Sequence, residues 1–139
     1  MKINEIMTKE VYTVSMDTTL KTIYEIFEKQ KFHHLIVVEE DELRGIISDR
    51  DLLKAISPFL NTLAEQDRDL FTLRKKAHQI MSRNPVTITK DASLEDAVNL
   101  LLNQKISCLP VVSPDTKIEG IVTWKDLLKA YSQLVDVEK

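Results

Sequence analysis

Glycine, cysteine and aromatic residues are scarce in this 139-residue chain. Its two glycines, Gly45 and Gly120, lie far apart. That excludes a P-loop and a dinucleotide-binding fingerprint, because both motifs need several glycines within a few residues. A single cysteine, Cys108, excludes an intramolecular disulfide and a cysteine-rich metal site. Nothing resembles a nucleophile paired with a base, so the sequence predicts a protein that is not an enzyme.

The chain also lacks a strong excess of charge and any long apolar run. Its net charge of −3 gives no general attraction to nucleic acid or to an anionic membrane surface. No apolar stretch approaches the roughly 20 residues that a membrane-spanning helix needs. The start, residues 1–5, carries an acid instead of the apolar centre of a secretion signal. We therefore expect a cytoplasmic protein with neither a nucleic-acid nor a membrane partner.

What the chain does contain is an internal repeat. Ile6-Met7-Thr8 matches Ile80-Met81-Ser82, an offset of 81 − 7 = 74 residues. Leu35–Val38 matches Leu109–Val112 at the same offset. Two copies are too few for a solenoid, so they indicate a pseudo-twofold pair of units, neither of which can bury its sheet alone.

The clearest part of the repeat is a pair of seven-residue segments, 45–51 and 120–126. Each reads glycine, two aliphatic residues, a hydroxyl residue, two variable residues and aspartate, and each continues as Leu-Leu-Lys-Ala. The offset is now 120 − 45 = 75, so the second copy carries one extra residue, which we place in the turn near 113–115. A strand that ends in a hydroxyl residue, with an acid three residues later, is typical of a strand running into a helix.

Each copy predicts the order β-α-β-β-α, and hence an α/β fold with a small mixed sheet. In the first copy we expect strands over 11–14, 35–38 and 43–47, a helix from Leu20, and a second helix from Asp49 to about Leu60. In the second copy we expect strands over 86–89, 109–112 and 118–122, a helix containing 94–101, and a last helix from Trp124 to about Leu134. The predicted organisation is residues 1–60 as the first unit, 61–79 as a helical linker whose first helix is capped at Thr62, and 80–139 as the second unit.

These repeated motifs make the chain resemble a tandem pair of cystathionine β-synthase (CBS) domains, known as a Bateman module. The resemblance covers Ile6 to about Ala130. It implies that the two units pack through their sheets about a pseudo-twofold axis and leave two clefts. It also implies a disc-like homodimer that binds AMP, ADP, ATP or S-adenosylmethionine and regulates a partner protein, with no cofactor required. The identity of that regulated protein is unknown.

The resemblance places particular residues in each cleft. The first cleft would join Ile121, Thr123 and Asp126 to Met7, Tyr12, Phe32 and His33. The second would join Ile46, Ser48 and Asp51 to Met81, Val86, Ile106 and Ser107. In related modules basic residues contact phosphate at the positions of His33 and His34, and Arg50 and Lys125 lie at the helix starts. We expect unequal clefts, with the first preferring the more anionic ligand.

The chemistry of the repeated aspartates supports a ribose site. An ionised aspartate only accepts hydrogen bonds, and it can accept from both hydroxyls of a ribose diol. A helix N-terminus beside it offers free N–H groups to a phosphate. We therefore predict Ser48 with Asp51, and Thr123 with Asp126, as the ribose-binding pairs.

Simpler interpretations stand beside these. Ser48-x-x-Asp51 and Thr123-x-x-Asp126 are also helix-capping patterns that need no ligand. His33 and His34 could form a metal pair, although neighbouring strand residues point to opposite faces. Cys108 is interpreted as a small buried residue.

Two alternative functions remain open. The module could be a ligand-free homodimeric scaffold for a partner protein, with both aspartates serving only as caps. It could also be a subunit whose catalytic partner is encoded separately.

Overall fold

The computed structural model describes the backbone of residues 1–138 and the side chains of residues 1–135. The chain divides into two compact units. The first-repeat unit contains residues 12–84, and the second-repeat unit contains residues 1–11 together with 85–139. The N-terminal segment, residues 1–11, therefore belongs with the second repeat, and the segment that precedes the second repeat, residues 77–83, belongs with the first. We call these two stretches the exchanged segments, because each crosses a strand of the other repeat. The unit boundaries that the sequence repeat predicts, after residue 60 and after residue 79, stay a prediction.

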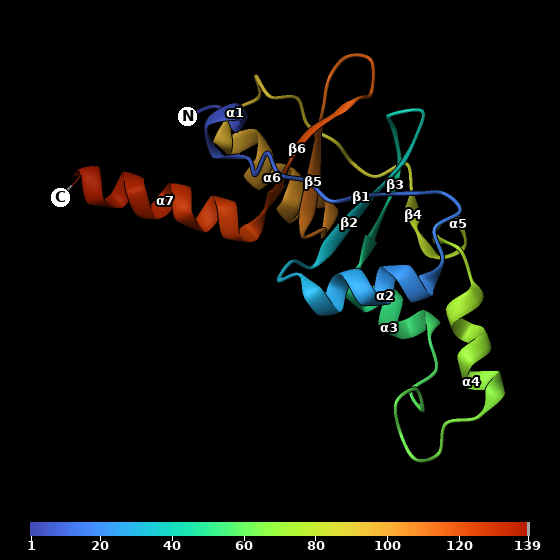
Figure 1. The fold of residues 1–139 in the computed structure, drawn as a ribbon. Helices are drawn as coiled ribbons and strands as arrows, with labels where there is room; N and C mark the ends of the chain where they lie inside the picture. The colour runs from blue at the N-terminus through green and yellow to red at the C-terminus, as the bar shows by residue number, and fades with distance from the viewer. Residues whose placement is uncertain (139) are drawn as a thin grey trace. The chain divides into compact units, whose positions relative to one another are not determined.

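A four-stranded sheet forms the first-repeat unit, in the order β1-β2-β3-β4 (Figure 1). Strand β1 is parallel to β2, and the pairs β2–β3 and β3–β4 are antiparallel. Helices α2 and α3 contact each other beside this sheet. The elements of the unit are β1 (Thr13–Ser15), α2 (Leu20–Lys29), β2 (His34–Glu39), β3 (Glu42–Ser48), α3 (Asp49–Ala55), α4 (Asp67–Phe71), the 3₁₀ helix η1 (Thr72–Arg74), α5 (Ala77–Ile80) and β4 (Ser82–Arg83).

The second-repeat unit repeats this topology around a two-stranded sheet. A parallel bridge from Ile88 to Val111 stands where β1 pairs in the first repeat, and an antiparallel bridge from Thr8 to Ile121 stands where β4 pairs. The predicted α/β pair of β-α-β-β-α units is thereby confirmed. The elements of the unit are α1 (Ile3–Ile6), α6 (Leu94–Gln104), β5 (Cys108–Val112), β6 (Ile118–Thr123) and α7 (Trp124–Glu138).

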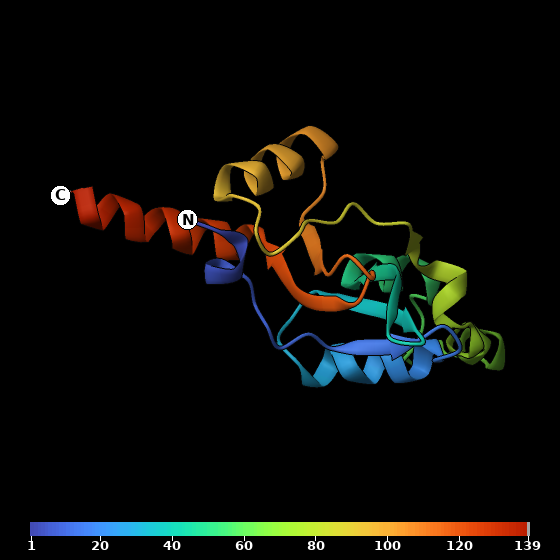
Figure 2. The same ribbon diagram turned by 90° about the horizontal axis from the view of Figure 1, so that it is seen from above.

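Two helices differ in length from their predicted extents. Helix α3 ends at Ala55 instead of near Leu60. Ile56 is already extended, with φ −102° and ψ 161°, and Pro58 disfavours the helical conformation at Ser57, so the helix does not continue. Helix α7 continues past Leu134 to Glu138. Figure 2 shows its C-terminal turns projecting beyond α1 and α6, the other helices of its unit. None of the helices described has the length and apolar character needed to cross a membrane.

The linker is helical only in part, and no helix begins at Thr62. The Thr62 hydroxyl donates to the carbonyl of Phe59 and closes a turn, and Leu63 is fully exposed. Without apolar contacts to bury, a short helix has little to stabilise it. The helix of this region is instead α4, which begins at Asp67, and the buried carboxylate of Asp69 in its first turn accepts hydrogen bonds from the Ser57 hydroxyl at 2.7 Å and from the backbone N–H of Gln66 at 2.8 Å. These bonds lower the pKa of Asp69, Ser57 contributing most, and tie the loop to the helix.

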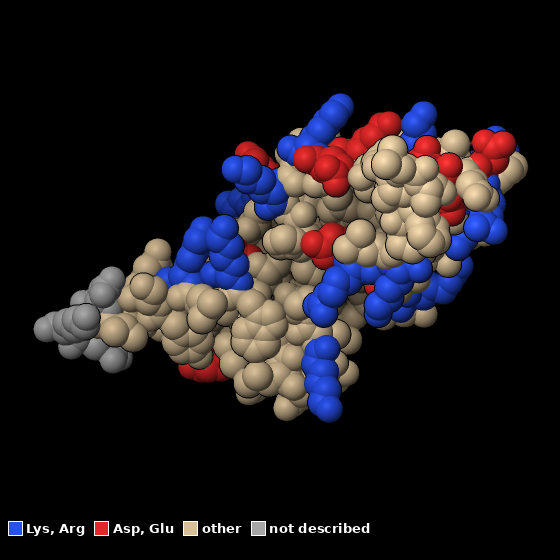
Figure 3. Space-filling view, turned by 90° about the horizontal axis from the view of Figure 1, so that it is seen from below, with Lys and Arg blue, Asp and Glu red and all other residues tan. Residues whose placement is uncertain are grey.

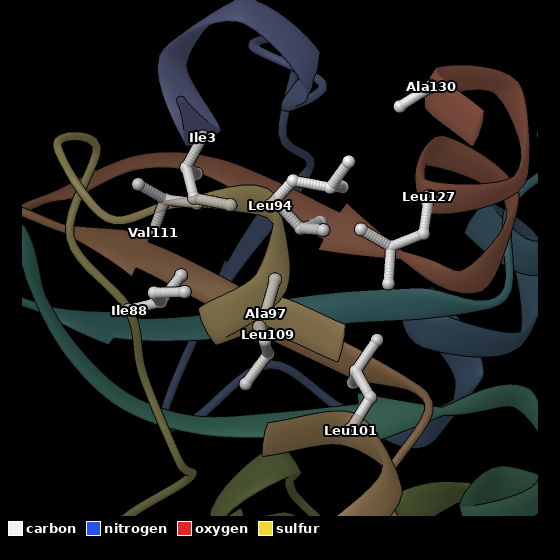
Figure 4. Packing of buried hydrophobic residues seen from close by; sticks show 10 residues of the cluster. Ile3, Ile88, Leu94, Ala97, Leu101, Leu109, Val111, Leu127 and Ala130 are labelled. Carbon is white, nitrogen blue, oxygen red and sulfur yellow. The ribbon is translucent and has the colours of Figure 1, made fainter. Parts of the chain in front are cut away.

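Each unit has its own apolar core. In the second-repeat unit Figure 4 shows Ile3 of α1 close to Val111 of β5 and to Leu94 of α6. Ile3 is completely buried although it lies in the N-terminal segment. In the first-repeat unit Ala77 of α5 is equally buried, among Leu20, Ile23, Leu35 and Ile47. The exchanged segments are thus parts of the cores of the units that they join.

Both glycines lie where an exchanged segment crosses a strand. A Cβ on Gly120 would lie 2.8 Å from the sulfur of Met7 and 2.9 Å from the carbonyl oxygen of Thr8. A Cβ on Gly45 would lie 2.6 Å from the sulfur of Met81 and 2.8 Å from the carbonyl oxygen of Ser82. Both glycines have ordinary backbone angles, so the reason for glycine is the closeness of the crossing backbone.

Replacing Gly120 by alanine is therefore expected to destabilise the protein. The methionine side chain can move, but the carbonyl of Thr8 is held by a 2.9 Å hydrogen bond from the N–H of Ile121. Crowding of this kind costs about 1–3 kcal/mol. Urea unfolding of Gly120→Ala measures it, with Lys129→Ala at an exposed position of α7 as the control. An unfolding free energy within about 0.5 kcal/mol of the parent would contradict the predicted crowding.

Candidate ligand-binding site

Two strand-to-helix junctions contain the predicted ribose pairs, one in each unit. Strand β3 ends at Ser48 and α3 begins at the next residue, and β6 ends at Thr123 directly before α7. Ser48 itself is extended, with φ −91° and ψ 162°, which turns the chain from strand into helix. Each junction therefore holds a hydroxyl residue and an aspartate within one helical turn.

In the first-repeat unit the pair forms a reciprocal cap. The N–H of Ser48 donates to Asp51 Oδ2 at 2.8 Å, and the N–H of Asp51 donates to Ser48 Oγ at 3.1 Å. The capping interpretation of this motif is therefore correct as far as the fold is concerned. It uses only one oxygen of the carboxylate. No donor among the described residues contacts Asp51 Oδ1.

The junction of the second-repeat unit is bonded differently. Asp126 Oδ2 accepts from the N–H of Thr123 at 2.9 Å and from its hydroxyl at 3.2 Å. Asp126 Oδ1 accepts from the hydroxyl of Thr8 at 3.0 Å. The carboxylate thus reaches past its own helix to the N-terminal segment. Sequence reasoning missed Thr8, although it occupies the repeat position of Ser82, which crosses the equivalent strand.

The two histidines lie beside the Ser48 junction but have different surroundings. His33 is exposed, and its Nδ1 lies 2.8 Å from Asp49 Oδ2, while the backbone N–H of Asp49 donates to the His33 carbonyl. His34 is the cross-strand partner of Ser48. Burial lowers the pKa of His34 below 6.5, and the carboxylate of Asp49 only partly opposes this. At neutral pH His34 therefore offers hydrogen bonds but little positive charge. Asp49 is a second residue that the motif analysis did not single out.

A metal site at His33 and His34 would need further ligands beside this possible pair. No group of three histidine, cysteine or acidic residues in the described part of the chain has the geometry to hold a metal ion. Cys108 takes the repeat position of His34, opposite Thr123. Burial, and then the nearby charge of Asp126, raise the pKa of its thiol well above the usual range, so Cys108 stays protonated. It is the small buried residue that the sequence predicts.

The other predicted site residues include apolar and basic side chains. Tyr12 and Phe32 stack with ring centroids 5.5 Å apart, and Phe27 lies 5.9 Å from Phe32. Arg50 and Lys125 are exposed in the first turns of α3 and α7. The side chains of Ile46 and Ile121 are half-buried on β3 and β6.

The structure distributes the predicted residues between the units. The first-repeat unit holds Tyr12, Phe32, His33, His34, Ile46, Ser48, Arg50, Asp51 and Met81. The second-repeat unit holds Met7, Val86, Ile106, Ser107, Ile121, Thr123, Lys125 and Asp126. Val86 and Ile106 also pack against the core of their unit. Each predicted cleft draws on both units, so its assembly stays a prediction.

Comparison with known sequences gives a consistent result. The family model described as CBS domain matches residues 3–58 and 77–133. A CBS domain-containing protein of Dictyostelium discoideum is 36% identical over 128 residues, which are 91% of this chain and 88% of that protein. An inosine-5'-monophosphate dehydrogenase of Methanocaldococcus jannaschii is 33% identical over 129 residues, which are 92% of this chain but 23% of the enzyme. The chain spans less than half the length of several relatives that it matches.

Solved structures with the same fold include nucleotide complexes. CBSX2 in complex with AMP superposes with a TM-score of 0.80 at 30% identity, covering 96% of this chain and 97% of that one. CBSX2 is a CBS-pair protein of Arabidopsis thaliana. The CBS domain pair of protein MJ0100, in complex with 5'-methylthioadenosine and S-adenosylmethionine, gives a TM-score of 0.77 at 25% identity, covering 96% of this chain and 97% of that one. The predicted resemblance is confirmed.

The lowered pKa of His34 leads to a pH-dependent stability. The unfolded chain, with the higher pKa, binds more protons, so the unfolding free energy falls as pH drops below about 6.5. In His34→Gln this contribution is absent. Going from about pH 7.5 to about pH 5.5, the parent should lose more stability than the variant in urea unfolding. Groups that do not interact with His34 cancel in the difference between the two proteins, and parallel losses would contradict the prediction.

Proposed function

Because the chain belongs to the CBS domain family and carries two of its units, we propose that it is a regulatory module for an adenosine-containing ligand. The ligand is AMP, ADP, ATP or S-adenosylmethionine, and the ligand state passes to a partner protein. The complexes of CBSX2 with AMP and of the MJ0100 domain pair with S-adenosylmethionine support this ligand class. The observation that carries the proposal is the open carboxylate oxygen of Asp51 beside a hydroxyl residue.

The chemistry of recognition follows from the bonds at this junction. A ribose diol needs acceptors, and Asp51 Oδ1 is an acceptor held in place by the bond from the Ser48 N–H to the other oxygen. Since Ser48 Oγ accepts from the N–H of Asp51, its own O–H can donate to the ligand. The cap therefore positions the ribose-binding group instead of competing with it.

The adenine and phosphate groups would use the remaining residues. The stacked rings of Tyr12 and Phe32 and the half-buried Ile46 and Ile121 offer apolar surface to a base. Arg50 and Lys125 supply positive charge for a phosphate. Regulation then works by a population shift, because a ligand that binds one arrangement of the module more tightly favours that arrangement.

A thermal-shift series with AMP, ADP, ATP, S-adenosylmethionine and NAD identifies the ligand. A ligand at 100-fold excess over its Kd stabilises the folded protein by about 2.7 kcal/mol, so the melting temperature should rise clearly with at least one adenosine compound. If none of them changes the melting temperature, the scaffold interpretation is favoured instead.

Aspartate-to-asparagine variants test the ribose contact directly. Asp51→Asn and Asp126→Asn remove the charge but keep an acceptor for the cap, so each should weaken nucleotide binding at its own junction about 10- to 100-fold in calorimetry. Asp96→Asn is the matched control, because Ser93 and Asp96 form the same capping box at the start of α6, with bonds of 3.0 and 3.1 Å. If both junction variants bound as tightly as Asp96→Asn, the ribose assignment would be wrong.

The homodimer is part of the same proposal. Helix α7 exposes a stripe of large apolar side chains at helical spacing, consisting of Trp124, Leu128, Tyr131, Leu134 and Val135. Figure 3 shows a largely uncharged surface beside the free end of this helix. Exposed apolar surface of this kind is typical of protein–protein contacts.

Leu128→Lys should separate the dimer. An ammonium group in the contact would raise the dimer Kd roughly 10- to 100-fold, measured by analytical ultracentrifugation over a concentration series. Lys129→Leu, on the neighbouring exposed position, is the control for a general change of helix polarity. If Leu128→Lys dimerises like the parent, the apolar stripe of α7 is not the contact.

A further inference from the structure

The two repeated aspartates have unequal capacity for a ligand. A carboxylate has about four lone-pair sites for hydrogen bonds. Asp51 uses one of them, for the N–H of Ser48. Asp126 uses three, for the N–H and hydroxyl of Thr123 and for the hydroxyl of Thr8. A diol that donates two hydrogen bonds fits the free sites of Asp51. At Asp126 one internal donor has to give way.

The third donor at Asp126 comes from a well-held part of the molecule. The N–H groups of Thr8 and Ile121 each donate to the carbonyl of the other at 2.9 Å. Met7 lies against Gly120, and Ile3 is buried in the core of the unit. The Thr8 hydroxyl is therefore kept beside Asp126 by its backbone.

The equivalent residue of the first repeat does not do this. Ser82 pairs with Ile46 in β4, as Thr8 pairs with Ile121. In the described part of the chain, however, the Ser82 hydroxyl makes no hydrogen bond to Asp51. The repeat thus supplies an internal comparison between two equivalent crossing segments, of which one donates to the carboxylate of its junction and the other does not.

We propose that Thr8 is a specificity-determining residue that acts as an internal competitor for Asp126. It lowers the affinity of the Thr123–Asp126 junction for a hydroxyl-bearing ligand, so that the Ser48–Asp51 junction is filled first. By linkage, a ligand that does bind Asp126 weakens the hold on Thr8 and loosens the N-terminal segment to the same extent. This inference rests on the proposed function, which supplies the diol ligand.

The test measures binding at Asp126 alone. In an Asp51→Asn background, calorimetry with the adenosine compound that gives the largest thermal shift reports the second junction. Adding Thr8→Val removes the hydroxyl and keeps the shape, so the affinity should rise about 3- to 10-fold. Adding Thr8→Ser keeps a hydroxyl and should leave the affinity unchanged. In an Asp126→Asn background, Ser82→Ala should have no effect.

Either of two binding results would overturn the inference. Unchanged affinity in Thr8→Val means that Thr8 does not compete, and reduced affinity means that Thr8 contacts the ligand itself. Ligand-free protein provides a separate measurement that does not need the proposed function. Amide exchange at Ile121 should be about 3- to 10-fold faster in Thr8→Val than in Thr8→Ser, because the crossing segment has lost one bond. If no adenosine compound binds any variant, the proposed function fails, while equal exchange at Ile121 overturns the competition by Thr8.

Discussion

Each unit depends on one bond from the last residue of a strand to the carboxylate three residues later. At the first junction it joins the N–H of Ser48 to Asp51, and at the second the N–H of Thr123 to Asp126, at 2.8 and 2.9 Å. This bond satisfies a backbone donor that the helix leaves unpaired. It also fixes the direction of a negative charge. A capping role and a binding role are therefore compatible, because the cap uses one oxygen and orients the other.

The exchanged segments link the two repeats through the chain. Each repeat lacks a crossing segment that the chain supplies from just before the other repeat, so neither is complete by itself. The crossing brings Met7 over Gly120 and Met81 over Gly45, with so little space that a methyl group would not fit. The strand that passes below the segment continues directly into the junction. A change at the junction therefore has a short path to the segment, through neighbouring residues of one strand.

Much of this architecture follows from the sequence because the repeat can be checked against itself. Aliphatic runs and helical patterns in two copies locate the strands and the helix starts, whereas the predicted end of α3 near Leu60 lies beyond its actual end at Ala55. The Thr62 region was misjudged because its capping pattern has no apolar face behind it, as the full exposure of Leu63 shows. The sequence also gives no sign that Glu40 and Asp41 turn with positive φ, since glycine or asparagine usually occupies such positions.

The candidate site is predictable in its residue types but not in its hydrogen bonds. Matching motifs identify Asp51 and Asp126 as equivalent, and on that basis both would bind a ribose alike. The difference arises from Thr8, which is 118 residues away from Asp126 in the chain and meets it only through the exchanged segment. Pattern analysis within one copy cannot detect such a partner. Once the crossing is known, the hydrogen bond from the Thr8 hydroxyl to Asp126, which the Ser82 hydroxyl does not make to Asp51 among the described residues, becomes the feature that separates two otherwise similar sites.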